Sequence, residues 1–305
     1  MRLVITGALG FIGQNLAHFL RRSGHPATLV GIDRYRDGPA AERAVFDQFH
    51  SGCFASDEGL ALAASGDAVV HLAAQASVRE SMIDPIGTFE TNAAQSLRLI
   101  DHLRRHAPNT HFVFASTGAV SQDAGPMDES ARPNPASPYG ASKLCAEAML
   151  RAYASAWGLA AVSLRFSNVY GPHSRRQGGV IPQFCRQMLE GSCLRINGDG
   201  RQTRDYIYVD DISQAIAAAL EARAEGLFQL GTGVRTSVME VAEIFRTLAP
   251  GRMPEVVHGP ALAGEIRNNL ANIAHARAEL GFVPQHSLQD GIARTLAWYQ
   301  SELVG

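Results

Sequence analysis

The sequence predicts an α/β fold built on a doubly wound parallel sheet, and two patterns predict it. Short, uninterrupted apolar runs alternate along the chain with longer segments in which apolar residues recur at helical spacing. Apolar runs without polar alternation are typical of strands that helices cover on both faces, as in a parallel sheet. Ligands of such sheets bind at the carboxyl ends of the strands.

The expected elements follow this rhythm along the chain. Strands are expected at residues 3–6, 27–32, 68–72, 111–115, 161–166 and 227–230. Helices are expected at residues 11–22, 87–106, 139–157 and 212–222. From about residue 167 the rhythm breaks into segments separated by Gly and Pro. We therefore expect residues 1–166 to form the sheet domain, with a segment near 206–232 returning to it, and residues 167–305 to form mainly a smaller C-terminal lobe.

Composition and charge argue against several classes of partner. The chain has 305 residues and a formal net charge of −2, so it lacks the basic excess that nucleic-acid binding requires. No apolar run approaches the ~20 residues that cross a bilayer, and the N-terminus is predicted to be a short strand and a turn rather than a signal peptide. Because Cys53, Cys145, Cys185 and Cys193 lack metal-binding spacing, we expect no metal site and a reducing, cytoplasmic location.

A glycine-rich loop follows the first expected strand. Residues 7–13 form a GxxGxxG pattern, whose glycines permit a close backbone approach to a pyrophosphate at the N-terminus of the next helix. Asp33 ends the second strand, about 20 residues after the loop, where a carboxylate binds a ribose and repels a 2′-phosphate. We therefore expect NAD rather than NADP. Arg34 and Arg36 could bind a 2′-phosphate, but we interpret them as solvated loop arginines. The expected dinucleotide contacts are Gly7, Gly10, Phe11, Ile12, Gly13 and Asp33.

A tyrosine and a lysine stand four residues apart at the start of the third expected helix. Ser137 and Pro138 suit the cap and the first position of this helix. Tyr139 and Lys143, a pair that alone would be read as a surface pair, share one helical face, and Thr117 ends the fourth strand at the edge where the glycine loop lies. An ammonium about 4 Å from a phenol is worth on the order of 4 kcal/mol at an effective dielectric constant of about 20, enough to bring a pKa of about 10 toward neutrality. We therefore predict that Tyr139 acts as a general base toward a substrate hydroxyl, which Thr117 also binds.

Together these motifs resemble the extended short-chain dehydrogenase/reductase superfamily and, within it, the NAD-dependent nucleotide-sugar epimerase/dehydratase family, which includes UDP-glucose 4-epimerase. The resemblance also rests on residues 71–75, 165–172, 204–211 and 264–265. It implies an NAD-binding Rossmann domain, a substrate-binding lobe, a homodimer, and catalytic roles for Thr117, Tyr139 and Lys143. Further implied cofactor contacts are Leu72, Ala73, Ala74, Gln75, Asn92, Ser116, Tyr139 and Lys143. The implied substrate contacts are Thr117, Tyr139, Asn168, Val180, Arg195 and Arg204.

Some of the implied substrate contacts also have simpler interpretations. The planar guanidinium of Arg204 suits phosphate oxygens, but it could instead pair with Asp205 or Asp210. Asn168 could hydrogen-bond local backbone. The loop at residues 173–179 either contacts substrate or is simply exposed.

The residues after Thr117 favour one reaction of the family. Members that dehydrate the sugar at C5 and C6 carry acidic residues directly after the strand-end threonine, whereas this chain has Gly118 and Ala119. The resemblance then implies an isomerase, a 4-epimerase of a UDP-hexose or UDP-N-acetylhexosamine that passes through a transient 4-keto sugar. A dehydratase or reductase of the same family is the alternative, and an NAD-binding protein without catalysis is a third.

Several positions depart from the family pattern and leave the sugar open. Leu262 stands where the family often has a phosphate-binding arginine, a role that Arg267 or a loop arginine could take. Cys53 and Ser121 replace a common aspartate and a common tyrosine. Asn269 occupies a position where residue size is associated with tolerance of N-acetyl groups.

The expected helices 87–106 and 139–157 offer more apolar surface than one sheet face requires. In the second helix, apolar and small residues wrap broadly around the axis; they are Leu144, Ala148, Met149, Ala152 and Ala156. A second apolar face predicts that these helices pair across a two-fold axis in a homodimer, with cover by the C-terminal lobe as the alternative.

Overall fold

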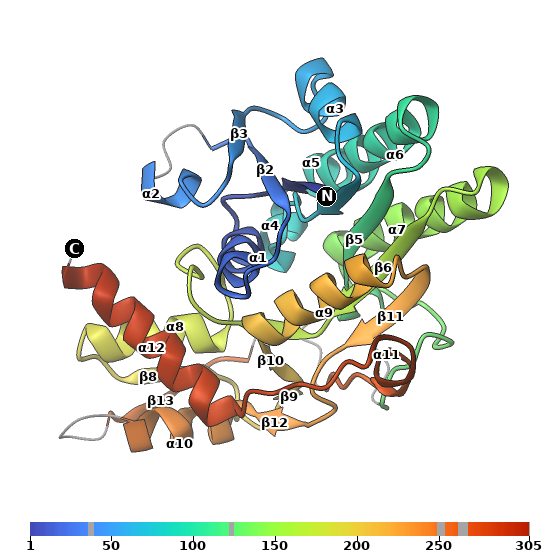
Figure 1. Ribbon diagram of the computed structural model, residues 1–305. Coiled ribbons are helices and arrows are strands. Elements are labelled where there is room, and N and C mark those ends of the chain that lie inside the picture. The colour runs from blue at the N-terminus through green and yellow to red at the C-terminus, as the bar shows by residue number, and fades with distance from the viewer. Residues whose placement is uncertain (36–39, 122–124, 249–253, 262–267, 305) are drawn as a thin grey trace.

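The computed structural model describes residues 1–35, 40–121, 125–248, 254–261 and 268–304. Its main strands are β1 (Arg2–Thr6), β2 (Thr28–Asp33), β3 (Gln48–Ser51), β4 (Ala68–His71), β5 (His111–Thr117), β6 (Ala161–Phe166) and β11 (Gly226–Leu230). They form one sheet in the order β11-β6-β5-β4-β1-β2-β3, in which every neighbouring pair is parallel (Figure 1). The expected doubly wound α/β class is confirmed.

The remaining elements divide between the layers that cover the sheet and a second lobe. The segments connecting or covering the main strands are α1 (Phe11–Arg22), α2 (Ala40–Arg43), α3 (Asp57–Ala64), α4 (Val78–Ile83), α5 (Pro85–Phe89), α6 (Gln95–His106), α7 (Pro138–Trp157), α9 (Val209–Glu221) and α11 (Ala274–Leu280). The lobe holds β7 (Asn168–Tyr170), α8 (Val180–Leu189), β8 (Leu194–Asn197), β9 (Thr203–Arg204), β10 (Tyr206–Tyr208), β12 (Thr236–Ser237), α10 (Val238–Leu248), β13 (Val256–Gly259) and α12 (Leu288–Val304). Within the described ranges, no helix is long and apolar enough to cross a membrane.

Alternate residues of the central strands pack against opposite helix layers. Leu3 and Ile5 of β1 lie in one buried cluster with Leu16 of α1. Val4, between them, lies in the other cluster with Leu99 of α6. This follows from the two-residue period of a strand, and burying each such side chain stabilises the fold by about 1.5–3 kcal/mol. The uninterrupted apolar runs of the sequence are therefore explained by cover on both faces.

The lobe has its own apolar core, beside the main sheet (Figure 1). Phe184 of α8, Phe245 of α10 and Ile292 of α12 are fully buried there. Three two-stranded sheets frame this core: β7 with β10, β8 with β13, and β9 with β12. The sequence rhythm did not predict these short strands or the helices α8, α10 and α12, because their core is completed by segments far apart along the chain.

The expected helix at residues 87–106 is irregular in the structure. Asp84 caps α5 by accepting a hydrogen bond from the Gly87 backbone N–H at 2.9 Å. A wider, π-helical turn at Glu90–Ala94 then separates α5 from α6 and contains the buried side chain of Asn92. Such turns are often found at functional sites, because they redirect a side chain that a regular helix would place elsewhere. The expected helix is present over its whole range, but it contains a π-helical turn that the sequence did not predict.

A chain of buried hydrogen bonds links β1, β4 and α6 through His71. The Ser96 hydroxyl donates to the Asn92 carbonyl at 2.7 Å and so accepts from Nε2–H of His71, 2.9 Å away. His71 Nδ1 therefore accepts from the Thr6 hydroxyl at 2.7 Å, and Thr6 Oγ1 accepts from the Ala73 backbone N–H at 3.3 Å. Burial, with a smaller contribution from the Lys143 charge, lowers the pKa of His71 to about 3, so the ring is neutral.

We predict that His71 makes the protein less stable in mild acid. Its folded-state pKa of about 3 lies below the unfolded value of 6.5, so its contribution to stability is complete above about pH 6.5 and declines as the pH falls toward 3. Between pH 7 and pH 5 the free energy of unfolding should fall by about 2 kcal/mol through this residue. Urea unfolding at both pH values should show a smaller drop in His71→Asn. The same substitution at the exposed His106 is the control, and an equal drop in all three proteins would contradict the prediction.

Candidate active site

The cavity lies where the order of the strands reverses, between β1 and β4. Its volume is about 1210 Å³, larger than the roughly 300–1,000 Å³ of most single-ligand pockets. The glycine loop after β1, the strand-end segment after β4 and the end of β5 line it on the side of the sheet. Segments of the lobe line the opposite side, so the cavity can hold a dinucleotide and a second ligand together.

The glycine loop passes so close to the segment after β4 that no side chain fits between them. Gly7 has φ of 71°, in the left-handed region, and a Cβ there would lie 2.7 Å from the backbone N of Ala73. A Cβ on Gly13 would collide with the Gly7 carbonyl oxygen. Gly10 provides the N-cap of α1 without a side-chain hydrogen bond, so the first N–H groups of the helix remain for a ligand. The loop therefore has the close backbone approach and the open helix N-terminus that the sequence predicted.

Asp33 ends β2 and lines the same cavity. Its Oδ2 accepts from the Leu9 backbone N–H at 2.9 Å, and its Oδ1 accepts from the Tyr35 backbone N–H at 3.0 Å. The carboxylate therefore fixes the glycine loop and retains lone pairs for ribose hydroxyls. Arg34 is exposed and also lines the cavity; Arg36 lies outside the described residues.

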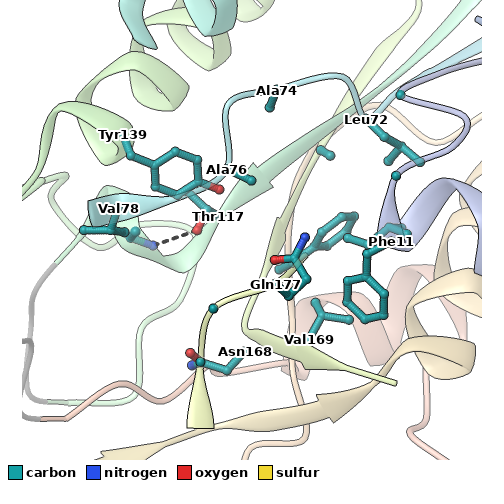
Figure 2. A pocket seen from close by; sticks show the side chains of 18 of the residues that line it. Phe11, Leu72, Ala74, Ala76, Val78, Thr117, Tyr139, Asn168, Val169 and Gln177 are labelled. Atoms are coloured by element: carbon teal, nitrogen blue, oxygen red, sulfur yellow. Dashed lines mark hydrogen bonds between the residues drawn. The ribbon is translucent and has the colours of Figure 1, made fainter. Parts of the chain in front are cut away.

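Tyr139 and Thr117 meet at the opposite wall, and Figure 2 shows the tyrosine hydroxyl directed toward the threonine. As predicted, Ser137 caps α7 by accepting from the Gly140 backbone N–H at 3.1 Å, with Pro138 in the first turn. Thr117 Oγ1 accepts from the Ala119 backbone N–H at 3.1 Å. Burial raises the pKa of Tyr139, and a hydrogen bond with Thr117 acts in the opposite direction. Two hydroxyl groups thus converge on one point of the cavity.

Lys143 lies behind this wall, with its ammonium group on a backbone carbonyl of β5. Its Nζ donates to the Ala115 carbonyl at 2.8 Å and lies 4.7 Å from the centre of the Phe114 ring. It is 3% exposed and does not line the cavity. Burial lowers the pKa of Lys143 to about 7.

Ser116 joins the cavity wall to a buried ion pair. Its hydroxyl donates to Glu147 Oε2 at 2.8 Å, and Glu147 pairs with Arg165 of β6 at 2.5 Å. Glu147 follows Lys143 by one helical turn, so both side chains point from α7 toward the sheet. These contacts fix α7 against β5 and β6, and thereby the position of Tyr139.

Asn92 and Gln75, both implied cofactor contacts, are held behind the cavity and do not line it. Asn92 Oδ1 accepts from the Gln75 backbone N–H at 2.8 Å, and its Nδ2 donates to the Gln75 carbonyl at 2.9 Å. Nδ2 also donates to Ser142 Oγ at 3.0 Å, and Ser142 donates to the Tyr139 carbonyl at 2.8 Å. The wide turn at Glu90–Ala94 aims this amide inward, and through Ser142 it connects the strand-end segment to the backbone of Tyr139.

On the lobe side, three of the four further implied substrate contacts line the cavity: Asn168, Val180 and Arg204. Figure 2 shows Asn168 at the lower edge of the site. Arg195 does not line it. In β8 its neighbours Leu194 and Ile196 face the lobe core, and the period of two turns Arg195 to the exposed face.

Asp205 and Asp210, the two carboxylates that were considered as partners of Arg204, bind other groups. Asp210 pairs with Arg22 at 2.9 Å, and the carboxylate of Asp205 accepts from backbone and hydroxyl groups. Asn269 is 7% exposed, lines the cavity and has no hydrogen-bond partner for Oδ1. Leu262, residues 264–265 and Arg267 lie outside the described residues.

The structure also brings to the cavity residues that were not among the implied cofactor and substrate contacts. Arg79 and Met82 come from α4, a short helix that the sequence did not predict. Gln177 and Gly179 come from the loop before α8, and Figure 2 shows Gln177 directed into the cavity. Tyr206 of β10 completes this side. For Gln177 and Gly179 the sequence left two alternatives open, because the loop at residues 173–179 was expected either to contact substrate or to be exposed.

We predict that Gly7→Ala removes NAD binding. The added methyl group meets two costs, a strained φ of 71° and a collision with the backbone of Ala73. Gly24→Ala is the matched control, because its φ of 68° is nearly the same and a Cβ there meets nothing within 4 Å. We expect Gly24→Ala to lose only about 1 kcal/mol of stability and to retain NAD. NAD content and the dissociation constant for NAD measure the difference; equal NAD binding by both variants would contradict the prediction.

Comparison with known proteins agrees with this geometry. Residues 3–231 match the model of the NAD dependent epimerase/dehydratase family. The chain is 33% identical to a UDP-glucose 4-epimerase of Mycolicibacterium smegmatis, with 99% of each chain covered. It is 32% identical to a dTDP-glucose 4,6-dehydratase of Streptomyces griseus, over 97% of this chain and 93% of that protein.

A solved structure shares the whole architecture. The UDP-glucuronic acid 4-epimerase of Bacillus cereus, in complex with UDP-glucuronic acid and NAD, is 28% identical, with a TM-score of 0.90 over 99% of this chain and 100% of that one. The family model covers well over half of the chain, and the relatives span nearly all of it. The chain therefore belongs to the NAD-dependent epimerase/dehydratase family.

Proposed function

We propose that this protein is an isomerase that inverts the C4 centre of a UDP-linked hexose or N-acetylhexosamine through a transient 4-keto sugar, with NAD as its cofactor. One observation carries the proposal: the hydroxyl groups of Tyr139 and Thr117 converge in a cavity large enough for two ligands, beside a glycine cradle. The first residues after Thr117 are Gly118 and Ala119, which bring no acid or base. A sugar alcohol can therefore be oxidised and reduced there, with no group to eliminate water.

The tyrosine moves the proton in this scheme. Tyr139 takes the proton from the C4 hydroxyl as the C4 hydrogen leaves with its electron pair, and it returns the proton when the ketone is reduced. Thr117 hydrogen-bonds the same oxygen and keeps it in line. NAD, when bound, would supply the acceptor for the C4 hydrogen and the positive charge of an oxidised nicotinamide. That charge favours ionisation of Tyr139, against the burial that raises its pKa.

We propose that the two parts of the cavity hold different ligands. The part lined by residues 1–166 would hold NAD at the glycine loop and Asp33, with the carbonyl-bound Lys143 turning toward the ribose. The lobe, mainly residues 167–305, would hold the nucleotide sugar. Arg204 would bind its phosphates, and the N-terminus of α8 at Val180 adds favourable dipoles.

The dehydratase relative makes a second reaction worth testing. Its identity to this chain is almost the same as that of the epimerase relative, so overall similarity does not separate the reactions. Gly118 and Ala119 favour epimerisation, because expelling a C6 hydroxyl needs a further acid and base near C5. An enzyme that oxidised the sugar without reducing it again would release an oxidised sugar and NADH, whereas a reductase would consume NADH. A protein that only binds NAD would not need the hydroxyl pair.

We expect the purified protein to convert UDP-glucose to UDP-galactose, or UDP-N-acetylglucosamine to its C4 epimer, in an NMR assay. Tyr139→Phe should cut kcat by about 10²–10⁴-fold and leave NAD bound, because it removes the proton acceptor but little packing. Tyr153→Phe on the same helix, whose hydroxyl bonds to Asp101, is the matched control and should keep wild-type turnover. A stable 4-keto-6-deoxy product, accumulating NADH, or full activity of Tyr139→Phe would each contradict the proposal.

We propose that the protein forms a homodimer through α5 and α7. Ile86 and Phe89 are 81% and 51% exposed on α5, which packs beside α7. Ala148 and Ala152 are exposed on α7, one turn apart, and permit close approach of a second helix pair. Light scattering should give twice the 32.7 kDa chain mass, and Ile86→Arg should shift the protein to the monomer. Val234→Arg, at a position 59% exposed in the lobe, is the control; a monomeric wild type would contradict the proposal.

We propose a cytoplasmic location for this activity. The four cysteines are unpaired, and Cys185 is buried, with burial raising the pKa of its thiol to about 12. Unpaired cysteines fit a reducing compartment.

A further inference from the structure

Asp205 lies between β9 and β10 and is fully buried. Its Oδ1 accepts from the backbone N–H and from the hydroxyl of Thr232, both at 2.7 Å. Its Oδ2 accepts from the backbone N–H of Gly233 at 3.0 Å and of Ala271 at 3.2 Å. All four partners are donors, so the site fits a carboxylate and not a group that carries hydrogen.

The segments that meet at Asp205 are those that line the lobe side of the cavity. Arg204 directly precedes it in β9. The Asn168 backbone N–H donates to the Asp205 carbonyl at 2.9 Å, where β7 pairs with β10. Asn269 lies two residues before Ala271, which the carboxylate binds directly, and its backbone N–H donates to the Thr203 carbonyl at 3.3 Å. The segments that carry these three cavity-lining side chains, from distant parts of the sequence, thus meet at the backbone and the carboxylate of Asp205 and at the adjacent strand β9.

The chain leaves no room around this carboxylate. A Cβ on Gly231 would collide with Asp205 Oδ2, and it would lie 2.7 Å from Ser167 Oγ and 2.9 Å from the Ala271 Cβ. Gly231 therefore has to be glycine for the end of β11 to reach Asp205. Asp205 does not itself line the cavity.

We propose that Asp205 is a positioning residue of the substrate subsite: it sets the positions of Arg204, Asn168 and Asn269 relative to one another. This inference rests on the proposed function, because it assigns these three residues to the nucleotide sugar. Removing the carboxylate charge should weaken binding of the sugar nucleotide, while the Tyr139 and Thr117 pair, on β5 and α7, keeps its geometry. The effect should appear in KM and leave kcat nearly unchanged.

The test is Asp205→Asn, which keeps the size of the side chain and places an NH₂ group against N–H donors. We expect KM for the UDP-sugar and the dissociation constant for UDP to rise by about tenfold or more, since bonds to a charged acceptor are worth roughly one to two factors of ten. kcat should stay within about threefold and the NAD content should not change. Thr232→Val, which removes one donor and keeps the backbone, should raise KM in the same direction by a smaller factor.

Asp211→Asn is the matched control. Asp211 is also fully buried, and it accepts from the Gln285 backbone N–H at 3.0 Å and from His286 Nδ1 at 2.8 Å, away from the cavity. Both Asp→Asn variants should lose thermal stability, but only the first should lose affinity for UDP. If KM and UDP affinity of Asp205→Asn match those of Asp211→Asn, or if Asp205→Asn does not fold and Thr232→Val keeps the wild-type KM, the inference is wrong. A wild-type protein that binds no UDP-sugar would instead refute the proposed function.

Discussion

The backbones that follow β1 and β4 run so close together that only glycine fits at residue 7. Every other part of the site depends on this contact. It brings the first turn of α1 to the edge of the sheet, where its N–H groups face the cavity. It also places Thr6 within reach of His71 and Ala73, so the loop is fixed from behind by the buried hydrogen-bond chain that continues to Ser96 and Asn92. The loop is held before any ligand arrives.

Burial shifts the pKa values of three titratable groups at or behind the cavity wall. It lowers the pKa values of His71 and Lys143 and raises that of Tyr139, so each group is pushed toward its neutral form. Glu147 and Arg165 pair with each other in the same region, and Ser116 adds a hydrogen bond to Glu147. A phenol in such surroundings gains little base strength from the protein alone. In the proposed reaction the chain therefore positions the two hydroxyl groups, and the positive charge that lowers the pKa of the phenol would come from the oxidised cofactor.

The lobe is organised differently from the sheet. Its short strands and helices share one apolar core, but the residues that it presents to the cavity are fixed by polar contacts at Asp205. The return of β11 to the main sheet brings Gly231–Gly233 to that carboxylate, so the sheet and the lobe are connected at the substrate side of the cavity. The end of β11 therefore links the main sheet, through its hydrogen bonds to Asp205, to the residues on the lobe side of the cavity.

The sequence alone determined six of the seven strands of the sheet, the glycine loop, Asp33 and the helix start at Ser137, because each depends on local spacing or on apolar periodicity. It did not indicate the edge strand β3, which is short and only partly buried. It also indicated Thr117 and Tyr139, which stand at the end of a strand and at the start of a helix. Only the tertiary structure decided which neighbours turn toward the cavity. Asn92 points inward because a wider helical turn redirects it, Lys143 turns to the Ala115 carbonyl, and Arg195 falls on the outer face of β8. The role of Asp205 could not be read locally either, since its four donors come from residues 232–233 and 271, and contacts between distant segments leave no periodic signal in the chain.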